Sequence, residues 1–142
     1  LVINNDHKIA DLVGCGLHIG LDIEDTNFLN EFKNISFIGL SCKNKPEIQK
    51  RKDANIFSYY SFGPLFESKT KENLTGLIDI YGVSNKMNKQ KLNVAIGGIN
   101  EINLGLVKQS KFNMAAICDG IYNDLKKIEV NCQKLLEIWN EN

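Results

Sequence analysis

The stretch Val94-Ala95-Ile96-Gly97-Gly98-Ile99-Asn100 decides the class of the fold. Its first three residues are apolar on successive positions, which is the pattern of a parallel strand covered on both faces. Met114-Ala115-Ala116-Ile117 repeats this pattern near the end of the chain. Because such strands alternate with helix-like segments, the sequence predicts an α/β protein built on a parallel sheet.

Four more segments with the composition of strands precede these two. The six predicted strands cover residues 1–4, 17–20, 36–41, 56–63, 92–97 and 114–118. Asn44 stands before Pro46 and Glu47, a combination typical of a helix N-terminus, so a helix is predicted there. Apolar residues recur at helical spacing from Ile121 to Trp139, which predicts one long amphipathic helix that faces the core.

Length and composition predict a single domain, residues 1–142. The chain is 43% hydrophobic and 24% charged, and its glycines and prolines are dispersed rather than gathered in a linker. Two architectures fit, namely an open doubly wound sheet and a (β/α)8 barrel, which typically takes about 250 residues. Length alone favours the open sheet. Both folds place their functional sites at the carboxyl ends of strands.

The charge argues against several classes of partner. There are 17 basic and 17 acidic side chains, and this balance is unlike that of a protein that coats nucleic acid or an anionic membrane. No apolar run approaches the roughly 18 residues that a membrane span needs. The 4 cysteines form no C-x-x-C pair, which predicts reduced, buried thiols and no zinc site. We therefore expect a cytoplasmic protein that binds neither nucleic acid nor membrane.

Two glycine-bearing strand ends are candidates for a phosphate site. Gly97 and Gly98 follow one predicted strand, and Cys118-Asp119-Gly120 follow the next. Glycine lets backbone N–H groups approach an oxyanion, and the N-terminus of a following helix adds its dipole. The alternative is that the glycines only form a tight turn.

A polar loop and a set of acidic residues complete the candidates. Residues 65–73 combine hydroxyl and ammonium groups that suit a diphosphate, although a solvated loop is the ordinary explanation. Asp6 and Asp22 follow the first two strands and suit magnesium. The alternative for Asp6 and Asp25 is that each caps a helix. We expect His18 to be satisfied by hydrogen bonds rather than to act as a base.

Five segments at predicted strand ends form an ordered set. They are Asn4-Asn5-Asp6, Gly16-Leu17-His18-Ile19-Gly20, Gly39-Leu40-Ser41, Phe62-Gly63-Pro64-Leu65-Phe66 with Thr70-Lys71, and Ala95-Ile96-Gly97-Gly98-Ile99. This set resembles the thiamine phosphate synthase family over essentially the whole chain, and the resemblance implies a TIM barrel. In this alignment the chain begins at the third strand of the barrel. We therefore expect about the last six βα units, the C-terminal part of the barrel, which cannot close the sheet alone.

The resemblance also implies a function. The family is a transferase that joins hydroxymethylpyrimidine diphosphate to hydroxyethylthiazole phosphate, giving thiamine monophosphate and pyrophosphate with Mg²⁺ as cofactor. The ligands would be phosphorylated small molecules, a homo-oligomer is left open, and Lys71 would be the catalytic residue. The substrate-binding residues would be Asn4, Ser41, Ser68, Lys69, Thr70, Lys71, Gly98, Cys118 and Asp119. The metal ligands would be Asp6 and Asp22, the acidic residues adjacent to Asn5 and Ile23, which occupy the family's metal positions.

Asp119 is a further departure, since the family carries serine beside the thiazole phosphate. An unpaired carboxylate there would repel a phosphate. We predict that Asp119 caps the terminal helix and occupies the N–H groups that a phosphate would use. Two alternative functions remain. One is a diverged, non-catalytic barrel that binds a phosphorylated ligand, and the other, ranked third, is a thiazole tautomerase-like protein, whose reactive histidine is Lys43 here.

Overall fold

The computed structural model describes residues 1–20, 23, 25–50, 54–67 and 78–141. Within them six strands form one sheet, and every neighbouring pair is parallel. The strands are β1 (Val2–Asn4), β2 (Gly16–Ile19), β3 (Ile38–Lys43), β4 (Tyr59–Phe62), β5 (Leu92–Ile96) and β6 (Met114–Ala116). All six lie where the sequence predicts them, and the predicted parallel α/β class is confirmed.

The helical segments are short except for the last one. The α-helices are α1 (His7–Val13), α2 (Ile80–Lys86), α3 (Leu104–Gln109), α4 (Asp119–Tyr122) and α5 (Ile128–Asn140). The 3-10 helices are η1 (Asn27–Glu31), η2 (Pro46–Lys50), η3 (Ala54–Ile56) and η4 (Leu125–Lys127). No helix in the described residues is long and apolar enough to cross a membrane.

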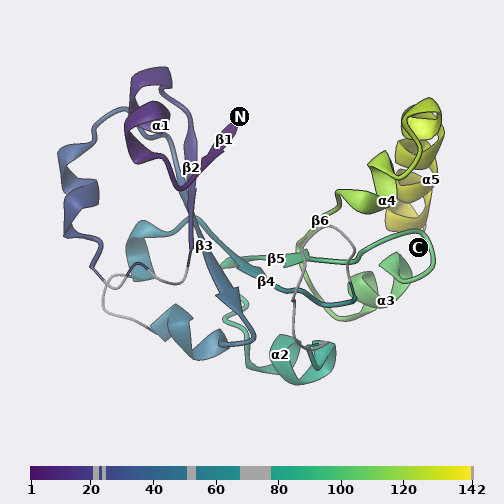
Figure 1. Ribbon diagram of the computed structural model, residues 1–142. Helices are drawn as coiled ribbons and strands as arrows, with labels where there is room; N and C mark the ends of the chain where they lie inside the picture. Colours follow the sequence, from purple (N-terminus) through teal and green to yellow (C-terminus); the bar gives the residue numbers. More distant parts are fainter. Residues whose placement is uncertain (21–22, 24, 51–53, 68–77, 142) are drawn as a thin grey trace.

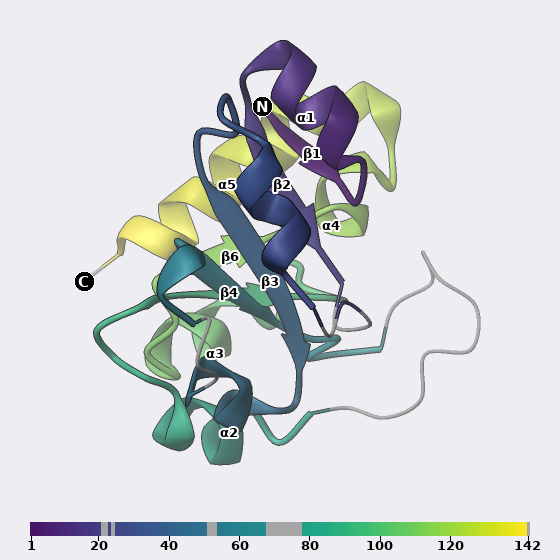
Figure 2. The same ribbon diagram turned by 90° about the vertical axis from the view of Figure 1, so that its left-hand side faces the viewer.

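Strand order decides between the two candidate architectures. Each strand pairs with the one before it in the chain, from β1 to β6 without a reversal. A doubly wound sheet has a point where the strand order reverses, whereas a barrel adds each strand to the last. The sheet curls into part of a barrel with helices on its outer side (Figures 1 and 2). The expectation from length, an open doubly wound sheet, is therefore wrong.

The two faces of the sheet differ in burial. The outer face carries the core, and these side chains from four neighbouring strands are at most 2% exposed: Leu17, Ile19, Leu40, Cys42, Tyr60, Phe62 and Ala95. The alternate positions form the inner face, and the strand register places Asn4, His18, Gly39, Tyr59 and Leu92 in one row across it. The inner face is the more open one, with Leu92 at 48% and Met114 at 53% exposure.

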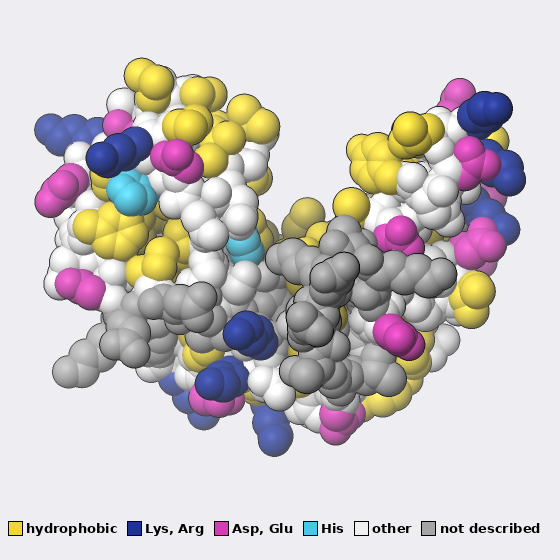
Figure 3. All heavy atoms as spheres, viewed as in Figure 1, with side chains coloured by type: hydrophobic (Ala, Val, Ile, Leu, Met, Phe, Trp, Pro, Cys, Tyr) yellow, Lys and Arg dark blue, Asp and Glu magenta, His cyan; other side chains and the backbone are white. Residues whose placement is uncertain are grey.

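A wide hollow separates the two ends of the curled sheet in the space-filling view (Figure 3). Exposed apolar side chains occur at both ends. Leu12 of α1 is 85% exposed and Leu136 of α5 is 61% exposed. A groove of about 460 Å³ runs between α5 and β6 and is lined by Leu104, Asn113, Met114, Ala115, Ile117, Ile121, Cys132, Leu135, Leu136 and Trp139.

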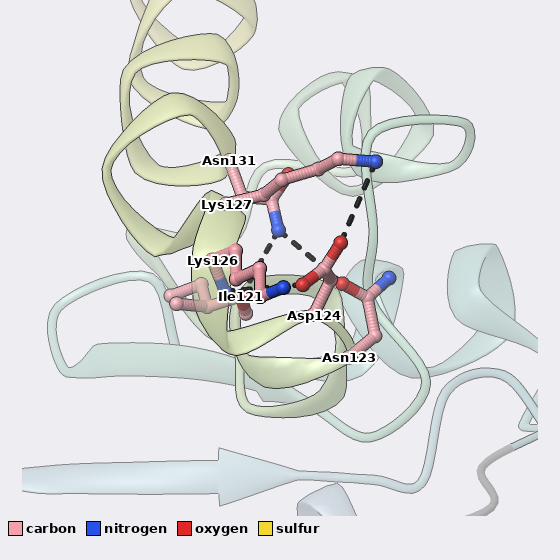
Figure 4. Close-up of polar contacts among 6 residues, drawn as sticks. All are labelled: Ile121, Asn123, Asp124, Lys126, Lys127 and Asn131. Atoms are coloured by element: carbon pink, nitrogen blue, oxygen red, sulfur yellow. Dashed lines mark hydrogen bonds and ion pairs between the residues drawn. The ribbon is translucent and has the colours of Figure 1, made fainter.

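The predicted C-terminal helix is divided, which corrects the expectation of one long helix. Asp124 adopts an extended backbone conformation, and its carboxylate accepts a hydrogen bond from the Lys126 backbone N–H at 3.0 Å. Asn131 bridges the break by donating to the Ile121 carbonyl at 3.0 Å and to Asn123 Oδ1 at 3.2 Å (Figure 4). Local capping therefore outweighs continuation of the helix. In α5 only Leu135 is buried, so the core-facing stripe is narrow.

Two smaller expectations have mixed outcomes. A helix follows Asn44 as predicted, and it is a five-residue 3-10 helix, Pro46–Lys50. A polar contact anchors it, because Gln49 donates to Asn93 Oδ1 at 2.7 Å in the interior. The cysteines are all free thiols, but Cys118 is exposed because it lies beyond the end of β6, whereas Cys15 and Cys42 are buried as predicted.

Candidate functional site

The carboxyl ends of β1 and β2 are tied together by Asn5. Its backbone is left-handed, with φ of 64°, and its N–H donates to the His18 carbonyl at 2.8 Å. Its side-chain Oδ1 accepts from the Gly20 N–H at 3.2 Å. Asn4, which ends β1, is exposed at this end of the sheet. Asn5, the residue at the family's metal position, therefore uses its amide oxygen in a structural hydrogen bond to Gly20.

Asp6 caps a helix, as the alternative interpretation predicts, whereas Asp25 lies one residue before Thr26, the N-cap of η1. Asp6 is the N-cap of α1 and accepts from the Ile9 N–H at 3.0 Å. Asp25 accepts from the Asn27 N–H at 2.9 Å at the start of η1. In the part of the chain that the structure describes, no three His, Cys, Asp or Glu side chains gather in a way that could hold a metal. The cap uses one carboxylate oxygen of Asp6, so the other oxygen is the candidate acidic metal ligand at the end of β1.

Four polar side chains from three adjacent strands meet on the inner face, and we call them the His18 cluster: His18, Ser41, Tyr59 and Ser61. His18 Nδ1 lies 2.8 Å from Tyr59 Oη, and Nε2 lies 2.9 Å from Ser41 Oγ and 3.5 Å from Ser61 Oγ. The His18 and Tyr59 rings stack with centroids 5.5 Å apart. Burial lowers the pKa of His18 and raises the pKa of Tyr59, so both are neutral at pH 7.

Glycine makes this cluster geometrically feasible. Gly39 lies between His18 and Tyr59 in the register of the three strands. A methyl group on Gly39 would come within 2.0 Å of Tyr59 Cζ, so the Tyr59 ring occupies the space above Gly39. The sequence predicts that His18 is satisfied, which is confirmed, but it does not identify Tyr59 or Ser61. The signal that could have found them is the shared register of His18, Gly39 and Tyr59.

The segment that follows β4 is bound to the glycine turn that follows β5. Leu65 N–H donates to the Ile96 carbonyl at 3.0 Å, and Phe66 N–H donates to the Gly97 carbonyl at 3.1 Å. Gly98 has a φ of 65°, and a methyl group there would lie 2.3 Å from the Glu67 carbonyl oxygen. The glycines therefore form a turn and also allow the backbone of the neighbouring loop to pack closely against it.

The two glycine-bearing strand ends lie against each other. A methyl group on Gly120 would lie 2.7 Å from the Ile99 carbonyl oxygen, so the start of α4 packs directly on the loop after β5. Asn103 reinforces that loop by donating to the Gly98 carbonyl at 2.9 Å. The two glycine-bearing strand ends are thus neighbours, as the sequence predicts, through the contact of Gly120 with Ile99.

Asp119 does not form the predicted cap. It is the first residue of α4, the N-cap position falls on Cys118, and that position makes no side-chain capping hydrogen bond. Asp119 is exposed. The hypothesis that its carboxylate imitates a bound phosphate is wrong, because the helix begins one residue too early for Asp119 to cap it.

Five of the predicted site residues lie outside the described residues: Asp22, Ser68, Lys69, Thr70 and Lys71. Ile23, which occupies the family's second metal position, is partly buried and packs against the core. The described residues therefore form two groups: the His18 cluster, which includes Ser41, on β2, β3 and β4, and the contacting loops that follow β4, β5 and β6.

Comparison with known proteins decides the family. The family model described as thiamine monophosphate synthase matches residues 1–121. The chain belongs to this family. Thiamine-phosphate synthase from Limosilactobacillus reuteri is 24% identical over 144 residues, which cover 98% of this chain and 66% of the relative. The Prochlorococcus marinus thiamine-phosphate synthase is 32% identical over 134 residues, which cover 89% of this chain and 36% of the relative.

A solved structure supports the barrel. The thiamine phosphate pyrophosphorylase from Pyrococcus furiosus superposes with a TM-score of 0.76 at 18% identity, covering 97% of this chain and 66% of that structure. At this identity the likeness speaks for the fold alone. The predicted TIM-barrel fold is confirmed for the thiamine monophosphate synthase family member described here. The chain spans about two thirds or less of the length of both curated relatives.

Proposed function

We propose that the protein is a thiamine phosphate synthase, with residues 1–142 as the C-terminal part of its barrel. In the proposed reaction the bond between the pyrimidine methylene carbon and the diphosphate oxygen breaks, and pyrophosphate leaves. The thiazole nitrogen then supplies its electron pair to the methylene carbon, which gives thiamine monophosphate. No protein nucleophile is needed, and the work of the protein is to orient two ligands and stabilise the leaving group.

One observation carries the proposal beyond family membership. The loops after β4, β5 and β6 contact one another through Phe66, Gly98 and Gly120. Glycine-bearing loops at the carboxyl ends of strands are a common place for backbone N–H groups to bind a phosphate. Ser41, whose Oγ contacts His18, is on the inner face of the same sheet. This arrangement suits one phosphorylated ligand beside one heteroaromatic ring.

The proposed roles of individual residues follow the family resemblance. Asn4 and Ser41 would bind the pyrimidine substrate. Ser68 and Thr70 would bind the thiazole phosphate, together with Gly98, Cys118 and the backbone beside Asp119. Lys71 would act as the catalytic residue by binding the departing diphosphate, and Lys69 would add charge to the same loop. A charge-assisted contact of this kind strengthens as negative charge develops on the leaving group.

Mg²⁺ is the proposed cofactor. Mg²⁺ in such sites takes one or two carboxylates and fills its remaining positions with water and substrate phosphates. Asp6 fits as one ligand, since its cap on α1 uses one oxygen, and Asp22 is proposed as the other. The ion would neutralise charge on the diphosphate. We also propose that the protein acts in the cytoplasm on small molecules, consistent with its free thiols.

The assay of the proposed function measures thiamine monophosphate and pyrophosphate after incubation of the protein with both substrates and Mg²⁺. Formation of both products in equal amounts supports the synthase. Binding of thiazole phosphate without product would favour the non-catalytic phosphate-binding barrel. The tautomerase-like alternative is weakened because Lys43, exposed at the end of β3, stands where that group carries its reactive histidine.

A further inference from the structure

The His18 cluster contains three side chains that the proposed function does not use. Only Ser41, on β3, has a proposed role, whereas His18 from β2 and Tyr59 and Ser61 from β4 flank it on both sides. Ser61 is 5% exposed, and the contacts of His18 with Tyr59 and Ser41 are short, at 2.8 and 2.9 Å. A histidine held on both ring nitrogens has a defined tautomer, and that tautomer determines what Ser41 can do.

The chemistry of the two partners selects the tautomer. A neutral imidazole has one N–H donor and one acceptor nitrogen. A phenol is a better donor than an aliphatic hydroxyl, and its oxygen is a poorer acceptor because the ring withdraws its lone pair. The favoured contact at Nδ1 is therefore Tyr59 O–H donating to the ring nitrogen, which leaves the proton of the imidazole on Nε2.

The surroundings of Nε2 agree with this assignment. Two hydroxyl oxygens, Ser41 Oγ at 2.9 Å and Ser61 Oγ at 3.5 Å, face this nitrogen. One N–H can be shared between two acceptor oxygens, whereas a single lone pair accepts well from only one donor. With Nε2–H directed at it, Ser41 Oγ accepts, and its own hydroxyl proton must point elsewhere.

We propose that Tyr59 and His18 are positioning residues that hold the Ser41 hydroxyl as a hydrogen-bond donor to a ring nitrogen of the pyrimidine substrate. The ring nitrogens of a pyrimidine accept hydrogen bonds. This inference rests on the proposed function for the identity of the ligand, but the tautomer can be measured without any ligand.

The first experiment determines the His18 tautomer by ¹⁵N NMR of the imidazole ring. The chain has only 2 histidines, so His7→Gln isolates the His18 signals. We expect the Nε2–H tautomer in this background and a mixture of tautomers in Tyr59→Phe. Tyr81→Phe is the matched control, because Tyr81 is 49% exposed on α2, away from the cluster, and it should leave the spectrum unchanged. An Nδ1–H tautomer before the Tyr59 substitution would overturn the proposal.

The second experiment measures the affinity for hydroxymethylpyrimidine diphosphate and for two analogues in which one ring nitrogen is replaced by C–H. One analogue should bind about 3- to 10-fold more weakly than the parent, the typical effect of one neutral hydrogen bond. Ser41→Ala should abolish this discrimination, and Tyr59→Phe should reduce it. Equal discrimination by Ser41→Ala and the unsubstituted protein would overturn the assignment of Ser41 as donor.

A pair of substitutions at His18 separates positioning from simple packing. His18→Gln keeps an N–H donor at the distance of Nε2 and should retain much of the discrimination between the analogues, whereas His18→Leu should lose it. Equal loss of discrimination in both variants would contradict the positioning of Ser41 by His18. If the unsubstituted protein binds no pyrimidine diphosphate, the proposed function and the ring-nitrogen assignment fail together, while the NMR tautomer still decides whether Tyr59 orients His18.

Discussion

Burial of His18 makes stability depend on pH. Its pKa is lowered in the folded protein, so the unfolded chain binds more protons than the folded one as pH falls below about 6.5. The free energy of unfolding should therefore decrease between pH 7 and 5.5, by at most about 1.4 kcal/mol per pH unit for one proton. Urea titrations at several pH values measure this slope. His18→Gln should flatten it, and an unchanged slope in His18→Gln would contradict the prediction.

Gly98 is a second residue whose replacement has a definite cost. Gly98→Ala combines a positive φ with a methyl group 2.3 Å from the Glu67 carbonyl oxygen. We expect it to reduce the free energy of unfolding by roughly 1–3 kcal/mol. Gly105→Ala is the matched control, because Gly105 lies in α3 with nothing within 4 Å of an added methyl. The control should stabilise the protein by about 0.5–1 kcal/mol, and a loss in both variants would point to a general intolerance of alanine.

Lys71 provides a kinetic prediction that rests on the proposed function. Lys71→Ala should lower kcat/KM by about 10- to 100-fold, since it deletes one charge-assisted contact to the leaving group. Steady-state release of pyrophosphate is the measurement. Lys89→Ala, at an exposed turn before β5, serves as the control for loss of a lysine. An unchanged kcat/KM in Lys71→Ala would remove Lys71 from the site.

At the scale of elements, the break before α5 depends on one side chain. Asp124→Ala should destabilise the protein by about 0.5–2 kcal/mol, because it removes the cap on Lys126. Asp124→Asn keeps the cap and loses only the exposed ion pair with Lys127, which is 3.5 Å long, so it should be nearly neutral. Thermal unfolding of the two variants measures the difference, and equal losses would assign the effect to the ion pair.

The elements also show what sequence reasoning can reach. The six strands were predictable because apolar runs such as Val94-Ala95-Ile96 must be buried wherever they occur. The division of the terminal helix was not, since apolar residues keep helical spacing across a break that Asp124 causes locally. The paired glycine loops were predictable from their positions at strand ends. The His18 cluster was not, because its members are 23 to 43 residues from His18 and meet only through strand register.

At the scale of the whole molecule, protection against hydrogen exchange should be uneven. β3 and β4 lie in the middle of the sheet, and each is hydrogen-bonded to a neighbouring strand along both of its edges. β1 and β6 end the described sheet and have 3 residues each. Backbone N–H groups of Leu40 and Tyr60 should therefore exchange much more slowly than those of Ile3 and Ala115. Mass spectrometry or NMR of the exchanging protein tests this, and uniform protection would contradict it.

The agreement of strand order with chain order has a consequence for synthesis on the ribosome. Every strand from β2 onward finds its hydrogen-bonding partner in the strand made just before it. Each βα unit can therefore add to an existing edge as soon as it emerges, without waiting for a distant segment. The loop after β4 is different, because it is held by Ile96 and Gly97, which are translated about thirty residues later. During synthesis the edge of the sheet where we propose that the ligands bind would thus be completed after the sheet that supports it.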